Sequence, residues 1–528
     1  MRVLLINPHY PISETPSPPL GLAFLAGALE AAEIEVKILD LVVYPYTKLD
    51  LEHVISDFNP HLIGATAVTM NFSHAARILQ DVKSLAPHIV TVMGGPHVSF
   101  CAQDTLASCP QIDAIIMGEG ENTLIELALS CQDRNSWSRI NGIAFRNQDG
   151  YVSTPPRKSI ADIDDLPDPA RHLIPLGRYR ALGLPISMTT SRGCPFQCIF
   201  CVGRKMVGGK VRYRNPKKVV DELAYLNALD FHQINIADDL FTASKKHCMA
   251  VCEEIIRRQL DVQWTSFARV DTVSREVLAR MKQAGCTAVS FGVESGCPEI
   301  LKRIKKGISL DQVLNAVNLC NQAGIIPQAS FILGLPGENE QTLQETVNFA
   351  QRLKRLGVLH GFHLLAPFPG TDVRENQHLY DLQIMSHNWD DYHANRAIVR
   401  TSAIDQQRLD GIVKEWQDHF DNWLDDIKQR RDNGTATQAE AWPLTNLEHI
   451  ILIYDLMMKS IIENMEPLPY DATVSELDLG YLLCQIDGQL DYTKAQIQNT
   501  LQYAIQKKYL TRVRTGGQCR WEWIDYLG

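Results

Sequence analysis

The sequence predicts an α/β protein made of two successive parallel-sheet units followed by a helical region. Three observations predict it: apolar strands alternate with amphipathic helices from the N-terminus, the alternation resumes after a proline-rich stretch, and it stops near Thr401. We therefore expect a Rossmann-like doubly wound parallel sheet at 1–150, a linker at 151–185, a partial (βα)6 TIM-type barrel at 186–400 and a mainly α region at 401–528.

The first unit has strand-like runs that are apolar throughout, such as "RVLLINP", "HLIGATAVT" and "IVTVMGG". Helical spacing in "LGLAFLAGALEAA", "FSHAARILQDVKSLA" and "ENTLIELALS" separates them. Continuous apolar strands between amphipathic helices are typical of a parallel sheet with both faces covered. Ligands of such folds bind at the carboxyl ends of the strands, where this sequence has "NP", "MGGPH" and "GEGE". The alternative is that these glycines form tight turns only.

The linker carries five prolines in "STPPRKSIADIDDLPDPARHLIPLGRY" and shows no sustained period, so we expect it to lie over the surface. The second alternation has six apolar runs: "PISMTTS", "QINIAD", "VQWTSFAR", "TAVSFGVE", "IPQASFILG" and "FHLLAP". Six such units fit a partial barrel with right-handed crossovers.

The last region begins with one long amphipathic helix, "DQQRLDGIVKEWQDHFDNWLDDIKQRR". Two helical patterns around Gly488 follow, and then a hairpin turning at Gly516 and Gly517. Helix, turn, helix and hairpin is the element order of a winged helix.

Composition excludes several classes of protein. The formal net charge of -10 argues against non-specific binding to nucleic acid or anionic membranes. The best apolar stretch, "HIILIYDLMMKSII", is short and contains Asp455, so we expect no membrane span. Thirteen cysteines spread over a long chain do not form a secreted disulfide framework, and we expect a reducing cytoplasmic location.

Three cysteines stand together in "TTSRGCPFQCIFC", directly after the first barrel strand. Cys194, Cys198 and Cys201 in C-x3-C-x2-C spacing suit a 4Fe–4S cluster and leave one iron open to a small molecule. Gly193 lets the backbone fold tightly there. The alternatives are a chance cluster or a zinc site with a distant fourth ligand. The other ten cysteines, Cys248 and Cys286 among them, are expected to be small buried core residues.

The cysteine spacing resembles the radical S-adenosylmethionine superfamily, and the resemblance extends from Pro185 to Arg400. It implies that S-adenosylmethionine chelates the open iron. Motifs at later strand ends imply further contacts: "ADDLFT" to the amino group, "SFARVD" to the carboxylate, "GVESG" to the ribose and "SFILGLPGE" to adenine. The residues implied are Phe200 beside adenine, Asp238 or Asp239, Arg269, Glu294 and Ser295, and Ile332 and Gly334. Asp238 could instead cap the next helix.

The first unit resembles the cobalamin-binding domain that precedes the barrel in a subgroup of these enzymes, through "INPHYP", "PPLGLAFLAGALE", "MGGPHVS" and "MGEGE". The Asp-x-His-x-x-Gly motif, whose histidine ligates cobalt in other cobalamin proteins, is missing. The resemblance therefore implies cobalamin held by strand-end loops, and the alternative is a degenerate domain that binds no cofactor. The expected contacts are Asn7, Pro8, Thr66, Thr69, Gly94, Gly95, Pro96, His97, Gly118, Glu119, Gly120 and Glu121.

The two resemblances together imply an enzyme that generates a 5′-deoxyadenosyl radical and uses cobalamin to methylate an unactivated carbon. A radical cyclisation or rearrangement like that of porphyrin cyclases is a second hypothesis, and a redox- or cobalamin-sensing regulator is a third. The implied partners are a small-molecule or peptide substrate and an electron donor such as flavodoxin or ferredoxin. Nucleic acid is not expected as a partner, because "TKAQIQNTLQYAIQKK" in the winged-helix-like part is only mildly basic. "WDDYH" at Trp389–His393 either lines the substrate pocket or is an ordinary polar loop.

Overall fold

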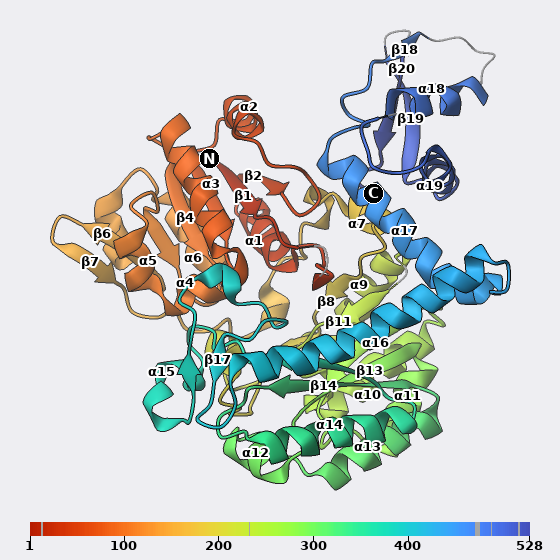
Figure 1. The fold of residues 1–528 in the computed structure, drawn as a ribbon. Helices are drawn as coiled ribbons and strands as arrows, with labels where there is room; N and C mark the ends of the chain where they lie inside the picture. The colour runs from red at the N-terminus through yellow and green to blue at the C-terminus, as the bar shows by residue number, and fades with distance from the viewer. Residues whose placement is uncertain (12–13, 232, 470–475, 487, 516–517, 528) are drawn as a thin grey trace.

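The computed structural model describes residues 1–11, 14–231, 233–469, 476–486, 488–515 and 518–527 (Figure 1). The N-terminal sheet has the strand order β2-β1-β3-β4-β5-β6-β7, in which the first five strands are parallel and the last two antiparallel. Its strands are β1 (Arg2–Asn7), β2 (Glu35–Asp40), β3 (Leu62–Thr66), β4 (Val90–Gly94), β5 (Ala114–Ile116), β6 (Ile143–Asn147) and β7 (Gly150–Ser153). This confirms the predicted doubly wound sheet, and the strand order reverses between β1 and β3, where such folds bind ligands.

Helices cover both faces of this sheet because alternate strand residues point to opposite sides. In β1, Val3 and Leu5 pack in one core with α1 and α6, whereas Leu4 and Ile6 pack in another with α3. The helices are α1 (Leu20–Ala31), α2 (Lys48–Phe58), α3 (Phe72–Leu85), α4 (Pro96–Phe100), α5 (Ala102–Ser108) and α6 (Glu121–Leu129).

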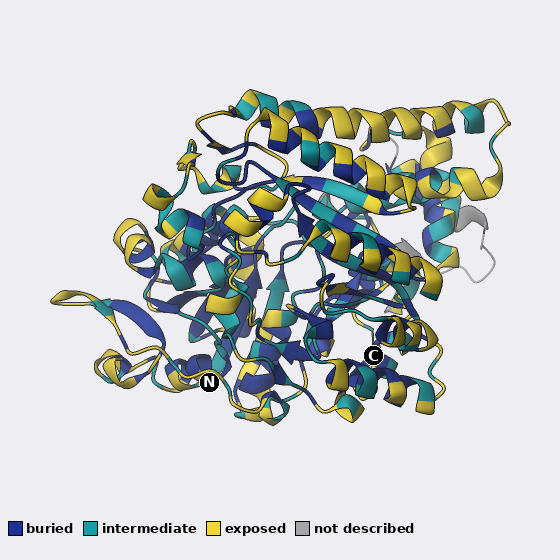
Figure 2. Ribbon diagram, turned by 90° about the horizontal axis from the view of Figure 1, so that it is seen from below, coloured by how far each residue is buried: buried dark blue, intermediate teal, exposed yellow. Residues whose placement is uncertain are grey.

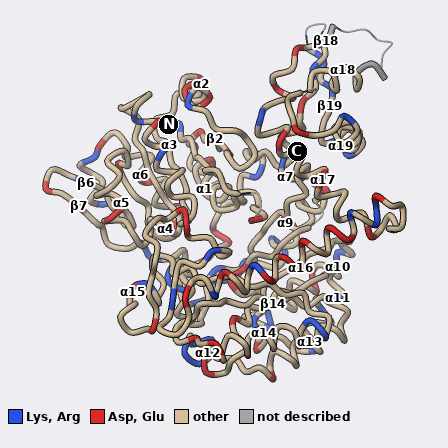
Figure 3. The backbone as a smooth tube through the Cα atoms, viewed as in Figure 1, with Lys and Arg blue, Asp and Glu red and all other residues tan. Residues whose placement is uncertain are grey.

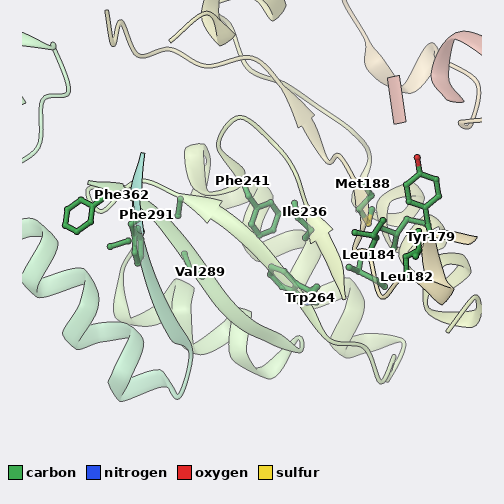
Figure 4. Packing of buried hydrophobic residues seen from close by; sticks show 14 of the residues in the cluster. Tyr179, Leu182, Leu184, Met188, Ile236, Phe241, Trp264, Val289, Phe291 and Phe362 are labelled. Carbon is green, nitrogen blue, oxygen red and sulfur yellow. The ribbon is translucent and has the colours of Figure 1, made fainter. Parts of the chain in front are cut away.

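The central sheet is fully parallel and has its strands in chain order, which confirms the partial six-stranded barrel. The strands are β8 (Ile186–Met188), β11 (Ile234–Ile236), β12 (Trp264–Ala268), β13 (Cys286–Glu294), β14 (Ile326–Leu333) and β15 (Leu359–Leu364). The helices after β8 and β11 to β14 are α9 (Pro216–Ala228), α10 (Lys245–Arg257), α11 (Arg275–Gln283), α12 (Pro298–Arg303), α13 (Leu310–Ala323) and α14 (Glu340–Arg355). Figure 4 shows part of the core, where Phe241 meets Trp264 edge to face.

Side-chain caps set where the barrel helices begin. Ser244 caps α10, Ser274 caps α11, and Ser309 and Asn339 form capping boxes at α13 and α14. Each cap satisfies a backbone N–H that would otherwise lack a partner at a helix start. Of the ten cysteines expected in the core, eight are buried, Cys248 and Cys286 among them, but the prediction is wrong for Cys101, which is partly buried, and for Cys484, which is exposed.

The composition of the proline-rich segment predicted a linker over the surface, but the structure shows that part of the segment is buried. Ala170, Ile174, Leu176 and Tyr179 are buried, and the last two belong to the short helix α7 (Leu176–Ala181). Tyr179 donates a 2.8 Å hydrogen bond to buried Asp40 of the first sheet. The segment is therefore a packed connector, because its scattered apolar side chains fill the space between the two sheets.

The C-terminal region is mainly helical, as predicted. α16 (Gln406–Asp432) crosses the barrel and its middle turns are exposed to solvent (Figures 1 and 2). α17 (Gln438–Met458) leads to a small unit with the order of a winged helix: β18 (Leu468–Pro469), α18 (Glu476–Ile486), α19 (Lys494–Gln506), β19 (Leu510–Thr515) and β20 (Gln518–Trp523). The predicted turn at Gly516 and Gly517 lies outside the described residues.

None of the helices in the described ranges has the length and apolar character needed to cross a bilayer.

Candidate functional site

The three clustered cysteines lie in the loop between β9 (Ser191–Arg192) and α8 (Gly203–Val207), which follows β8. We call residues 193–202 the cluster loop. Gly193 has φ +117°, and a Cβ there would lie 2.6 Å from the carbonyl oxygen of Lys210, so only glycine fits this turn. Cys194 and Cys198 are partly buried and Cys201 is exposed, and all three are free thiols.

The donor set of the cluster loop fits a cubane cluster better than a single ion. Within the described ranges, no group of three cysteine, histidine or carboxylate residues is placed to hold one metal ion. A cluster does not need that convergence, because each thiolate binds a different iron. Burial raises the pKa of the Cys198 thiol, and the nearby cations Lys306 and Arg269 oppose that shift.

Two adjacent carboxylates at the end of β11 hold the cluster loop in place. Asp238 is buried and accepts hydrogen bonds from the Thr190 amide, the Thr190 hydroxyl and the Ser191 hydroxyl at 2.5, 2.6 and 2.6 Å. Asp239 accepts the Gly193 amide through Oδ2 at 3.1 Å. Of the two residues predicted to meet the amino group of S-adenosylmethionine, Asp238 is thus occupied in positioning the loop, and Asp239 keeps Oδ1 available.

A cavity of about 370 Å³ opens inside the barrel at the carboxyl ends of the strands. It is lined by Asp238, Asp239, Leu240, Phe267, Ala268, Arg269, Ser290, Gly292, Lys306, Ser330 and His363. Sequence reasoning found three of these, Asp238, Asp239 and Arg269. It missed the inward-facing residues Phe267, Ser330 and His363, although alternation along β12, β14 and β15 could have indicated them.

Arg269 carries the clearest binding signal in this cavity. Its Nε and one terminal nitrogen contact Asp271 at 3.0 and 2.9 Å, and its guanidinium lies 3.6 Å from the Phe196 ring centroid. Its other nitrogen, Nη1, is buried without a hydrogen-bond partner among the described groups. A buried unpaired donor is costly, so this atom suits an anionic ligand such as a carboxylate.

The other residues implied for S-adenosylmethionine occupy different environments. Glu294 is buried with φ +70° and pairs with Lys306 at 2.6 Å, and the Lys306 ammonium lies 5.9 Å from the centroid of the Phe200 ring. Ser295 is fully buried and contacts the Thr346 hydroxyl of α14 at 3.0 Å, away from the cavity. Ile332 packs against the core, and Gly334 has φ +84°.

A second cavity, of about 420 Å³, lies between the carboxyl ends of the N-terminal strands and the cluster loop. It is largely apolar, with α1 residues such as Leu22 and Phe24 on one wall and Arg192, Met206 and Val207 on another. Eight of the predicted cobalamin contacts line it: Thr66, Gly94, Gly95, Pro96, Gly118, Glu119, Gly120 and Glu121. Gly95 has φ +104° and a Cβ there would lie 2.6 Å from the Ala67 oxygen, whereas Gly118 faces open space.

Four predicted cobalamin contacts do not line this cavity: Asn7, Pro8, Thr69 and His97. Asn7 donates to Asp40 at 2.8 Å. His97 is buried, contacts the Thr69 hydroxyl at 3.2 Å, and packs against Trp389. Burial lowers the pKa of His97 to about 4. No histidine is among the lining residues, so the donor set fits a corrin gripped by backbone and apolar groups.

Buried ion pairs join the two domains at this cavity. Arg192 of β9 contacts Glu121 at 2.8 Å and Glu119 at 3.3 Å, and Arg212 of β10 (Arg212–Tyr213) contacts Glu119 at 2.8 Å. These pairs hold the pKa of Glu119 below its usual value against the effect of burial. Sequence reasoning did not find Arg192 and Arg212, because their partners are distant in the chain.

The two cavities meet at Asp239, which lines both. The site combines three free thiols at the end of the first barrel strand, a buried guanidinium nitrogen without a described hydrogen-bond partner, and an adjacent apolar crevice. These features fit an iron–sulfur enzyme with two organic cofactor sites.

Comparisons with known proteins agree with this class. A family model for the Radical SAM superfamily matches residues 188–350, and one for a B12 binding domain matches residues 13–128. An uncharacterized methyltransferase of Pyrococcus horikoshii is 33% identical over 423 residues, covering 79% of this chain and 91% of that protein. The anaerobic magnesium-protoporphyrin IX monomethyl ester cyclase of Rubrivivax gelatinosus is 32% identical over 445 residues, covering 80% and 78%.

The chain belongs to the radical S-adenosylmethionine superfamily and carries a B12-binding domain. Its cofactors are accordingly a 4Fe–4S cluster, S-adenosylmethionine and cobalamin. Two solved structures share its fold. The cobalamin-dependent radical enzyme OxsB has a TM-score of 0.68 at 20% identity, covering 96% of this chain and 79% of that one. The methyltransferase TsrM of Kitasatospora setae has a TM-score of 0.62 at 23% identity, covering 74% and 82%.

Proposed function

We propose that this enzyme transfers a methyl group to an unactivated carbon of a small-molecule or peptide substrate. The observation that carries the proposal is the position of Asp239, which lines both the apolar crevice and the barrel cavity. A methyl donor in the first and a substrate radical in the second would therefore be neighbours. Holding two reactants close together in this way supplies much of the rate acceleration of an enzyme over the same reaction in solution.

When bound, the cluster and S-adenosylmethionine supply a radical that abstracts hydrogen, and cobalamin supplies a transferable methyl group. The chain's own residues bind and orient. Cys194, Cys198 and Cys201 would hold the cluster. Arg269 Nη1 and Asp239 Oδ1 are the groups that would receive the carboxylate and amino group of S-adenosylmethionine.

The crevice at the N-terminal sheet supports a cobalamin whose lower face has no protein ligand. Its wall offers glycine backbone at Gly94, Gly95 and Gly118, which permits close approach of a flat ring. No lining residue is a histidine, so no imidazole in this wall would coordinate cobalt. Leu22 and Phe24 give the crevice apolar side chains that would exclude water from a bound corrin.

The substrate would enter the barrel beside Phe267, which is 51% exposed although it lies within the sheet. His363 and Ser330 offer hydrogen bonds on the same wall. An external one-electron donor is required, and nucleic acid is not a partner in this proposal. We place the enzyme in the cytoplasm, because the free thiols of the cluster loop need a reducing compartment.

A radical cyclisation is the second candidate. The similarity to the Rubrivivax gelatinosus cyclase favours it, because that cyclase is 32% identical to this chain and the methyltransferase relative is 33% identical. Reduced enzyme incubated with cell extract and methyl-labelled S-adenosylmethionine separates the two. Methyl transfer yields a labelled substrate-derived product together with S-adenosylhomocysteine, 5′-deoxyadenosine and labelled methionine. A cyclase yields 5′-deoxyadenosine and labelled methionine but no labelled substrate-derived product, and that result would overturn the proposal.

A further inference from the structure

The sequence around the cluster loop has an unusual charge distribution. Between Asp168 and Asp221 there is no acidic residue, although the chain as a whole has 61 and a net charge of -10. A second basic segment, "KRIKK", runs from Lys302 to Lys306. Part of this positive charge is buried and neutralised, since Arg192 and Arg212 pair with Glu119 across the domain boundary.

Arg171, Arg178, Arg214 and Lys306 are also buried and paired with carboxylates. Five exposed cations lie on two segments that each contact the cluster loop. Arg204 and Lys205 belong to α8, and Lys210 follows it, whereas Lys302 and Lys305 lie at the end of α12. The Ile199 amide of the cluster loop donates to the Ile304 oxygen at 3.2 Å and joins that loop to the second segment. We call Arg204, Lys205, Lys210, Lys302 and Lys305 the basic rim, and Figure 3 shows blue segments beside α12.

The charges of the basic rim are poorly neutralised. Arg204 and Lys205 donate to the carbonyl oxygens of Pro195 and Gly370, which carry no net charge. Lys305 has an exposed carboxylate partner, Asp372, at 3.6 Å. The ion pairs seen in the described part of the chain do not include Arg204, Lys205, Lys210 or Lys302. Exposed pairs of the Lys305 type contribute ~0–1 kcal/mol, so the rim keeps its positive field.

The position of the basic rim indicates which kind of partner it could bind. Arg204 contacts Pro195, inside the cluster loop, and the loop contacts the Ile304 oxygen through Ile199, so rim residues flank the loop whose Gly193 amide is bound by Asp239. A positive field there attracts an anionic macromolecule to the surface beside the cluster loop. Small cofactors and substrate use the cavities instead.

We propose that the basic rim is the docking surface for an acidic one-electron carrier protein of the flavodoxin or ferredoxin type. The carrier gives one electron to the oxidised cluster and is itself oxidised by one electron, so no further reactant is needed. This inference rests on the proposed function, which requires a reduced cluster.

The test uses the holoenzyme with Lys210→Glu and Lys302→Glu combined, because both side chains are exposed and lie outside the cofactor cavities. Lys354→Glu with Arg355→Glu is the matched control, since it makes the same change in net charge at the end of α14. Two readouts are compared without substrate: the stopped-flow rate of cluster reduction by a reduced bacterial flavodoxin, and calorimetric binding of the oxidised flavodoxin.

The rim variant should be reduced by flavodoxin ~10-fold or more slowly at low salt, because electrostatic steering raises association rates by ~10–1,000-fold. The difference should largely disappear near ~1 M salt, where screening is almost complete. Reduced methyl viologen should reduce the variant no more slowly than the wild type, which shows an intact cluster. An unchanged flavodoxin rate, or an equal loss in the control variant, would overturn the inference. Displacement of flavodoxin by a short RNA at physiological salt would also overturn it and favour nucleic acid. With reduced methyl viologen as the electron donor, methyl transfer can be measured in either case, so the proposed function is tested separately from the docking surface.

Discussion

Arg192 and Glu121 form a buried ion pair of 2.8 Å that joins the strand before the cluster loop to the first residue of α6. The two side chains are only 15% and 6% exposed. The pair brings the wall of the apolar crevice and the start of the cysteine loop into direct contact. Its position at the N-terminus of α6 also favours the carboxylate, because helix N-termini carry partial positive charge.

Removing Arg192 should therefore damage both stability and cobalamin retention. Arg192→Met leaves the Glu121 and Glu119 carboxylates buried with one cation fewer, and breaking a buried pair in this way costs about 3–5 kcal/mol. Denaturant unfolding of the apoprotein and the cobalamin-to-protein ratio measure the two effects. Arg134→Met is the control, because Arg134 is 55% exposed and Asp113 keeps its second cation, Lys83, at 2.6 Å, so its loss should cost less than ~1 kcal/mol. Equal losses in both variants would show that the domain contact has no special role.

The cluster should depend on three cysteines only. Cys194→Ala, Cys198→Ala and Cys201→Ala should each abolish cleavage of S-adenosylmethionine and lower the iron content after anaerobic reconstitution. Cys248→Ala and Cys286→Ala should keep about four irons per chain, because their thiols are buried in the core and face no cavity. Iron and sulfide analysis with paramagnetic resonance checks this. A loss of iron in Cys248→Ala equal to that in Cys198→Ala would refute the ligand assignment.

Binding of S-adenosylmethionine should depend on Arg269 more directly than on Glu294. Arg269→Met removes the orphaned donor Nη1 and should cost about 1.5–3 kcal/mol of binding, the value of one charge-assisted hydrogen bond. Glu294→Gln should act through Lys306, which loses its 2.6 Å partner. Equilibrium dialysis measures affinity, and the cluster spectrum reports whether the iron site is intact. An unchanged affinity in both variants would remove these residues from the pocket.

Glu338 should make the protein less stable as the pH rises. Its carboxyl is fully buried, one oxygen accepts the amides of Gly334 and Leu335, and burial raises its pKa to about 8. The unfolded chain releases this proton near the ordinary pKa of 4.5, whereas the folded chain keeps it up to about 8. Between these values the folded state binds more protons, so stability falls with rising pH by at most roughly 1.4 kcal/mol per unit.

The Glu338→Gln variant isolates that effect, because an amide does not titrate in this range. Urea unfolding at several pH values should show the variant gaining stability relative to the wild type from pH 6 to pH 8. A difference between the two proteins that stays constant with pH would mean that Glu338 is ionised in the folded state.

The strands and the cysteine loop could be predicted from the sequence because their signals are local. Apolar runs between amphipathic helices define the two sheets, and Gly193 with three nearby cysteines defines one loop. The strand ends also predicted eight residues of the crevice wall, since parallel strands bring their carboxyl ends to one edge. The antiparallel strands β6 and β7 and the burial of Tyr179 depend on packing between distant segments.

The direction of each side chain could not be predicted in the same way. Asp238, Ser295 and Asn7 stand at the expected strand ends, yet each uses its polar group within the fold, on Thr190, Thr346 and Asp40. Arg192 and Lys306 were missed because their partners, Glu121 and Glu294, are identified only by the folded geometry. The absence of acidic residues between Asp168 and Asp221 was the signal that could have indicated a charged boundary.

The central claim is that cobalamin lies in the crevice beside the cluster loop without a histidine on its cobalt. The most direct measurement is the paramagnetic resonance spectrum of the protein purified anaerobically with hydroxocobalamin and reduced to the cobalt(II) form. We expect about one cobalamin per chain and a spectrum without superhyperfine splitting from a protein nitrogen, because His97 of α4 is buried against Thr69 and Trp389 and no histidine lines the crevice. Nitrogen splitting from a histidine, or a protein that retains no cobalamin, would contradict the account.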